Sequence, residues 1–177
     1  MTESREPAQG ADIKGFLRGD RDPASQRRMS DVGRAAVPAR TSFVTLAVRD
    51  LAQMAKFYRQ FGWPESKFSD DSFVAFRTAG AVLGLFPAHN YEREFGPVAT
   101  GDGFKGFVLA INLENAARVD EVYSVVKDFD GIRLTGAPED LSFGGRGFTF
   151  VDPEGNAWEV VWAEETSFDE RGGLIFP

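Results

Sequence analysis

The sequence contains no cysteine and only one histidine, His89. Without cysteine, the chain has no disulfide and no thiolate for catalysis or metal binding. With one histidine, any site that needs two histidines from the same chain is excluded as well. The net charge is −7, which argues against nucleic acid or an anionic membrane as the main partner.

Long apolar runs are missing too. No stretch approaches the roughly 20 residues that a transmembrane helix needs, and the first residues carry no apolar segment of the secretory type. We therefore expect a cytoplasmic protein. The hydrophobic content is nevertheless 42%, with 17 phenylalanines among 177 residues. That is enough for a sizeable core in one domain, or in two small modules that share a sheet.

Residues 1–40 differ in composition from the rest of the chain. They are rich in Arg, Asp, Ser, Gly, Pro and Ala, with few large apolar side chains and no clear periodicity. Such a stretch buries too little surface to offset its ordering entropy. We expect a mobile tail, with a docking arm as the alternative, and Met29 within it offers a second start codon.

A regular pattern begins at Phe43. The stretch FVTLAV alternates large and small side chains, as a strand with two different faces would. Asp50 and Gln53 resemble a capping box, and an apolar stripe of helical spacing follows them. SFVAFRTAG and AVLGLFP then predict a hairpin around Gly80.

The same order of elements recurs later in the chain. A strand begins at Gly106, a second helical stripe runs from Val119 to Phe129, and a hairpin around DPEG comes last. This predicts an α+β protein with two βαβββ modules, at 43–88 and 106–163, joined by a loop. The modules make up a domain at 41–165, and a C-terminal tail follows at 166–177.

Strand alternation assigns side chains to two faces. One face carries bulky residues such as Trp158 and Val160, which would pack under the helices. The other face carries mostly small residues and Glu159, and a sheet face that no helix covers leaves room for a cleft. We expect Glu159 to point into this cleft; the alternative is an ordinary solvated strand face.

Two stretches resemble the vicinal oxygen chelate superfamily, which holds glyoxalase I, extradiol dioxygenases, and fosfomycin- and bleomycin-resistance proteins. They are FVTLAVRDLAQMAKFYRQFGW at 43–63 and GRGFTFVDPEGNAWEVVW at 145–162. The resemblance covers about residues 43–163. It implies two βαβββ modules whose sheets curl around a cleft, and very often a homodimer.

Metal-dependent members of this superfamily hold a divalent ion with four positions, which the resemblance aligns with Phe43, Gly84, Gly106 and Glu159. Only Glu159 carries a ligating side chain, whereas a catalytic transition metal needs about three protein ligands. We therefore expect no metal and no cofactor. The resemblance then points to the metal-free branch of the superfamily.

Several side chains are candidates for a ligand site. Arg146 in FGGRG could bind a carboxylate or phosphate, although a solvated arginine is the alternative. Phe43, Phe76, Phe86 and Phe148 could form an aromatic wall, with a core position as the alternative for Phe76 and Phe148. The full set of expected ligand-binding residues is Phe43, Thr45, Phe86, Val108, Arg146 and Glu159.

Four functions remain open on this basis. The first is a metal-free protein of the glyoxalase and bleomycin-resistance type that binds a small apolar or aromatic molecule in a cleft. The second is a metal-independent lyase or isomerase with Glu159 as the catalytic general base. A metal-dependent glyoxalase or dioxygenase, and an interaction module with a filled cleft, are the others. No nucleic acid or membrane partner is expected.

Overall fold

The computed structural model describes residues 40–99, 103–142 and 144–175. The tail expected at 1–40, with Met29, lies outside these residues except for Arg40. Ser42–Pro177 form one compact unit, which contains both modules. Within the described residues, no helix has the length and apolar character needed to cross a membrane.

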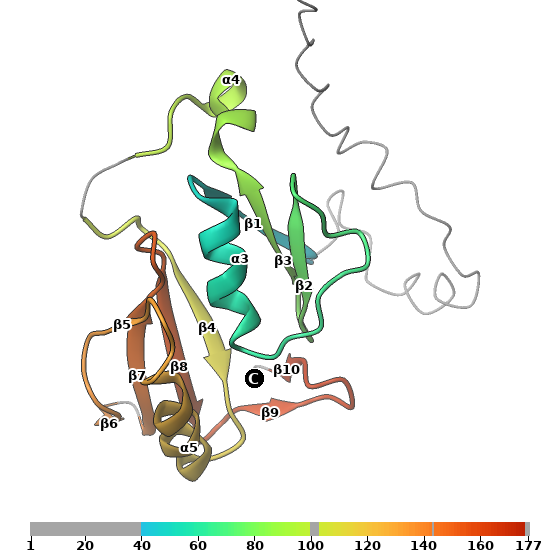
Figure 1. The fold of residues 1–177 in the computed structure, drawn as a ribbon. Helices are drawn as coiled ribbons and strands as arrows, with labels where there is room; N and C mark the ends of the chain where they lie inside the picture. The colour runs from blue at the N-terminus through green and yellow to red at the C-terminus, as the bar shows by residue number, and fades with distance from the viewer. Residues whose placement is uncertain (1–39, 100–102, 143, 176–177) are drawn as a thin grey trace, which may run out of the picture. The chain divides into compact units, whose positions relative to one another are not determined.

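The first module is built on a three-stranded sheet with the order β1-β3-β2 (Figure 1). β1 pairs in parallel with β3, and β2 pairs antiparallel with β3. The expected third strand after the helix is reduced to the isolated bridges Glu65↔Phe76 and Asp70↔Phe73. The Asp70 carboxylate accepts hydrogen bonds from Ser72 and Phe73, and this local turn replaces a ladder there. The elements are β1 (Phe43–Val48), α3 (Leu51–Arg59), β2 (Val74–Arg77) and β3 (Val82–Pro87).

The second module has a five-stranded sheet with the order β4-β8-β7-β5, and β6 also pairs with β7. β4 and β8 run parallel, as β1 and β3 do in the first module. The α+β class is confirmed, but the sheets are not strongly curled. The elements are β4 (Val108–Asn112), α5 (Ala116–Val126), β5 (Arg133–Leu134), β6 (Glu139–Leu141), β7 (Gly145–Val151) and β8 (Ala157–Ala163).

Short elements fill the connections before and after the second module. The loop between the modules contains η1 (Ala88–Asn90) and α4 (Glu92–Phe95). The segment after residue 165 is not extended chain alone, because β9 (Ser167–Phe168) and β10 (Leu174–Ile175) pair as an antiparallel hairpin.

Both longer helices begin at a side-chain cap. The Asp50 carboxylate accepts a hydrogen bond from the Gln53 N–H at 2.9 Å, and Asn115 caps α5 in the same way through the Arg118 N–H at 3.0 Å. Such caps satisfy backbone donors that have no partner within the helix. They fix where each helix starts relative to the strand before it.

One hydrophobic core joins the two modules. Tyr58 of α3 packs against Trp158 of β8, with ring centroids 5.9 Å apart, and Phe61 contacts Phe129 beyond α5 at 5.3 Å. Phe76 and Phe148 are buried in this core. They therefore belong to the packing of the helices on the sheets and not to an aromatic wall.

Candidate functional site

Glu159 lies in the middle of β8, between Ala110 of β4 and Thr149 of β7 in the strand register. Its neighbours Trp158 and Val160 are buried under the helices, so the Glu159 side chain leaves the opposite face of the sheet. Among the described residues no side chain forms an ion pair or hydrogen bond with the Glu159 carboxylate. Glu159 is half-buried.

A hollow of about 430 Å³ adjoins Glu159 on this face. The hydroxyl-bearing residues Thr135 and Thr149 line it, together with Pro138, Leu141 and Gly147. Thr135 and Thr149 are bonded to each other through their hydroxyls. The hollow thus has two lining carboxylates without a described side-chain partner, Glu139 and Glu159, beside hydroxyl groups, and its lining comes from the second module.

The corresponding face of the first sheet is aromatic. Phe43 and Thr45 of β1 lie on it, and Thr45 pairs with Gly84 of β3. A Cβ built at Gly84 would lie 2.4 Å from Cε1 of Phe43. The Phe43 ring therefore occupies the space that a side chain at position 84 would need.

Phe43 is the first ring of a row that continues into the loop between the modules. Successive ring centroids are 6.2, 6.1, 5.4 and 5.9 Å apart, which is within the range of favourable ring pairs. The row ends at Phe95, which is 79% exposed. We call this set the aromatic row; its members are Phe43, Phe73, Phe86, Tyr91 and Phe95.

The remaining candidates are divided between two faces. Val108 of β4 is 48% exposed and lies on the same face as Ala110 and Glu159. Arg146 of β7 lies on the other face, because it shares the parity of the buried Phe148. Arg146 is therefore separated from Glu159 by the sheet.

Arg146 is engaged with two aspartates beside α5. Its guanidinium pairs with Asp120 at 2.8 Å and with Asp140 at 2.9 Å. The hydrogen bond from Arg146 holds the pKa of the Asp120 carboxyl below its usual range. These contacts tie α5 to β6 and β7. The Arg146 charge, which the sequence suggested for a ligand, is thus paired within the chain.

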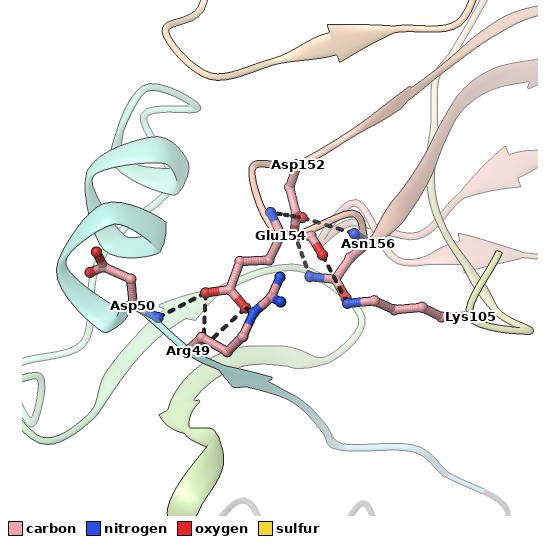
Figure 2. Close-up of polar contacts among 6 residues, drawn as sticks. All are labelled: Arg49, Asp50, Lys105, Asp152, Glu154 and Asn156. Atoms are coloured by element: carbon pink, nitrogen blue, oxygen red, sulfur yellow. Dashed lines mark hydrogen bonds and ion pairs between the residues drawn. The ribbon is translucent and has the colours of Figure 1, made fainter. Parts of the chain in front are cut away.

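A second carboxylate, Glu154, has a structural role that the sequence did not reveal. It lies in the turn between β7 and β8, and its side chain is only 5% exposed. Its oxygens accept hydrogen bonds from the backbone N–H groups of Arg49 and Asp50 at 2.8 to 3.0 Å. Figure 2 shows the carboxylate pointing at the chain just before α3. The turn of the second module is thereby bound to the first module.

Asp152, at the start of the same turn, is also buried and fully engaged. It accepts hydrogen bonds from the Asn156 side chain and from the Tyr58 hydroxyl, each at 2.7 Å. Trp158 donates to the Tyr58 oxygen at 3.0 Å. Burial, followed by the charge of Asp152, raises the pKa of Tyr58 well above its usual value. Tyr58 thus stays neutral and donates to Asp152.

The remaining side of this turn is covered by Lys105. Its ammonium group donates to the Glu154 carbonyl oxygen at 3.0 Å and to Asn156 Oδ1 at 3.1 Å (Figure 2). All three polar side chains of the turn, Asp152, Glu154 and Asn156, therefore have partners. We call Asp152, Glu154, Asn156, Tyr58 and Lys105 the turn network.

Comparison with known families gives a match to residues 40–160 by the model of the Glyoxalase/Bleomycin resistance protein/Dioxygenase superfamily. The chain belongs to this superfamily. No curated protein matches its sequence.

Solved structures of this superfamily share the fold. A glyoxalase-related enzyme from Fulvimarina pelagi is 24% identical over 78% of this chain and 98% of its own, with a TM-score of 0.68. A glyoxalase/bleomycin resistance protein/dioxygenase family enzyme from Burkholderia phytofirmans PsJN is 25% identical, covering 71% and 99%, with a TM-score of 0.61. A lactoylglutathione lyase from Agrobacterium tumefaciens is 23% identical, covering 71% and 95%, with a TM-score of 0.56.

The residues at the four aligned metal positions do not fit a divalent ion. The Phe43 ring fills the space beside Gly84, Gly106 has no side chain, and Glu159 alone offers oxygen ligands. Among the described residues, moreover, no group of three His, Cys, Asp or Glu side chains is placed to hold a metal. No catalytic step is therefore assigned to a metal at these positions.

Proposed function

We propose that this protein is a metal-free, small-molecule-binding member of the superfamily, which holds an apolar or aromatic ligand on a sheet face that no helix covers, either at the aromatic row of the first sheet or at the Glu159 hollow of the second. The observation that carries the proposal is the Phe43 ring over Gly84. At two positions where metal-dependent relatives would carry ligands, this chain has an aromatic surface instead.

The aromatic row supports an apolar or flat ligand. Rings at these spacings can be extended by one more ring from a ligand, and Phe95 leaves most of its surface open for such a contact. Glu159 supplies a polar group at the second sheet face, where it would bind a donor on the ligand. A charged hydrogen bond of this kind contributes about 1.5–3 kcal/mol.

A screen of small molecules by thermal shift tests the proposal, because a ligand that binds only the folded state raises its stability by RT ln(1 + [L]/Kd). Hits should include flat apolar compounds with a donor group. Glu159→Gln should weaken the binding of hits at the Glu159 hollow about tenfold or more, whereas Phe43→Leu should weaken the binding of hits at the aromatic row. Glu164→Gln, which changes an exposed acid beyond β8, is the matched control.

A metal-independent lyase or isomerase is the alternative use of the same hollow. It is favoured by one observation, namely that the Glu159 carboxylate has no partner among the described side chains and so could accept a proton from a substrate. In that case Glu159→Gln would abolish turnover of a hit compound and leave its affinity nearly unchanged. If the wild type turns over no hit compound and Glu159→Gln lowers the affinity for it, the result supports the binding protein.

We also propose that the protein acts as a cytoplasmic homodimer. Apolar side chains at and before β4 support this part of the proposal, because Phe104, Phe107 and Val108 are 70%, 40% and 48% exposed. Exposed apolar groups of this size are typical of surfaces that meet a partner. Sedimentation velocity across a concentration series measures the oligomeric state, and Phe107→Ser should shift it towards the monomer.

A further inference from the structure

A second cavity lies away from the Glu159 hollow, and the two share no lining residue. Its volume is about 460 Å³, within the range of small-molecule sites. One wall comes from Val44 and Leu83, which pair across β1 and β3. The facing wall comes from Leu109 and Ile111 of β4.

Trp63, Trp158 and Phe168 are the aromatic residues of the lining, and the two tryptophans lie side by side. Trp63, which follows α3, and Trp158 of β8 have ring centroids 5.8 Å apart, inclined at 50°. Both line the cavity, and Trp158 does so from the face opposite to Glu159. Aromatic surface of this kind favours a ligand with a ring.

Arg77, the last residue of β2, provides the charge of the cavity. It is exposed, and no described side chain forms an ion pair or hydrogen bond with its guanidinium. The described lining contains no Asp or Glu. In a chain of net charge −7, an unpaired arginine at an apolar cavity is complementary to a carboxylate, which guanidinium groups bind in two-point geometry.

The β9–β10 hairpin covers the cavity. Phe168 and Leu174, which pair across the hairpin, both line it. Gly172 lies in the turn of this hairpin with φ +79°, and a Cβ built on it would lie 3.6 Å from the Cβ of Ala79. The turn is therefore close to Ala79 of the first module. Figure 1 shows β9 and β10 at the end of the β2–β3 hairpin. The last described segment therefore bridges from β8 to the first module.

We propose that this cavity is a second ligand site, which takes a small aromatic carboxylate with its ring against Trp63 and Trp158 and its carboxylate on Arg77, beneath the β9–β10 hairpin. The proposal does not depend on the function proposed for the Glu159 face. A ligand could occupy either site with the other one empty.

Titration calorimetry of the full chain with naphthalene-2-carboxylate tests the site, and naphthalene-2-carboxamide is its neutral analogue. We expect one carboxylate per chain, bound about tenfold or more tightly than the amide. Arg77→Gln should remove this preference and leave the affinity for the amide unchanged. Arg133→Gln, an exposed arginine on β5 at the far edge of the sheet, should change neither affinity.

The cover is tested by Gly172→Val, which strains a left-handed backbone position. Both ligands should then bind more weakly, whereas Gly96→Val, at φ +80° with open space around it, should leave binding intact. Phe168→Ala, which removes the cover's ring without backbone strain, should act like Gly172→Val. The proposal is overturned if the carboxylate does not bind, if Arg77→Gln leaves the preference intact, or if Glu159→Gln abolishes binding while Phe168→Ala does not affect it.

Discussion

Replacement of Glu154 by Gln is expected to destabilise the fold substantially. In the native turn both carboxylate oxygens accept from the N–H groups of Arg49 and Asp50, at 2.8 to 3.0 Å. Gln keeps the shape but has a single acceptor oxygen, and its amide group turns a donor towards one of these backbone donors. A hydrogen bond to a charged group contributes about 1.5–3 kcal/mol, and a buried donor without a partner costs about 1–3 kcal/mol.

From these terms we expect Glu154→Gln to lower the free energy of unfolding by about 2–4 kcal/mol. Single domains have only about 5–15 kcal/mol in total. Urea unfolding measures this difference through the midpoint at constant m-value. Glu164→Gln is the control with the same chemical change at an exposed acid, and it should stay within about 0.5 kcal/mol of the wild type.

Hydrogen exchange gives a local measurement of the same contact. The amides of Arg49 and Asp50 should exchange faster in Glu154→Gln by more than amides in the middle of β8, because their acceptor is weakened directly. A variant with wild-type stability and unchanged exchange at these two amides would refute the idea that the turn binds the modules together.

The other predictions concern the sheet face, the buried tyrosine and the arginine beside α5. Gly84→Ala should cost roughly 1–3 kcal/mol of unfolding free energy because it overpacks against Phe43, whereas Gly80→Ala, which meets open space, should be neutral in the same urea series; equal midpoints would contradict the packing. Since the pKa of Tyr58 is raised in the folded state, its contribution to stability is present below about pH 10 and is lost as the pH rises towards the folded pKa. The free energy of unfolding of the wild type should therefore fall more steeply from about pH 9 to pH 11 than that of Tyr58→Phe, and parallel curves would contradict this. Arg146→Gln should leave small-ligand affinity unchanged in titration calorimetry, because its guanidinium is held on the helix side by two aspartates; a loss of about tenfold would contradict its placement.

The sequence predicted features that depend on neighbouring residues. Alternation along β8 separates Glu159 from Trp158, because successive side chains of a strand leave opposite faces. The Asp50 cap and the helical stripe of α3 are local in the same sense, and each is present in the structure. Alternation also places Arg146 on one face with Phe148 and Phe150, but the pattern of β7 alone does not say which of its faces packs under the helices.

The sequence did not predict contacts between distant segments. The partners of Glu154 are 104 and 105 residues away along the chain, and an acid in a turn is usually solvated. The one local signal was the density of polar groups in DPEGN, where the Asp152 carboxylate accepts hydrogen bonds from the backbone N–H and the side-chain amide of Asn156. The aromatic row was found only in part, because Phe73 and Tyr91 lie outside the strands whose faces alternation could assign.

Two carboxylates five residues apart thus have opposite environments, and this difference separates folding from binding. Glu154 is buried and its acceptor capacity is used within the chain, so its replacement should lower stability and leave the affinity of the folded protein for ligands unchanged. Glu159 is half-buried, with no partner among the described side chains. Its replacement should therefore leave stability nearly unchanged and weaken ligand binding. A buried charge without a partner would be costly, and the hollow beside Glu159 explains why its charge is tolerated there. If both variants changed stability and affinity together, the turn and the strand would act as a unit, and the site could not be assigned to the sheet face alone.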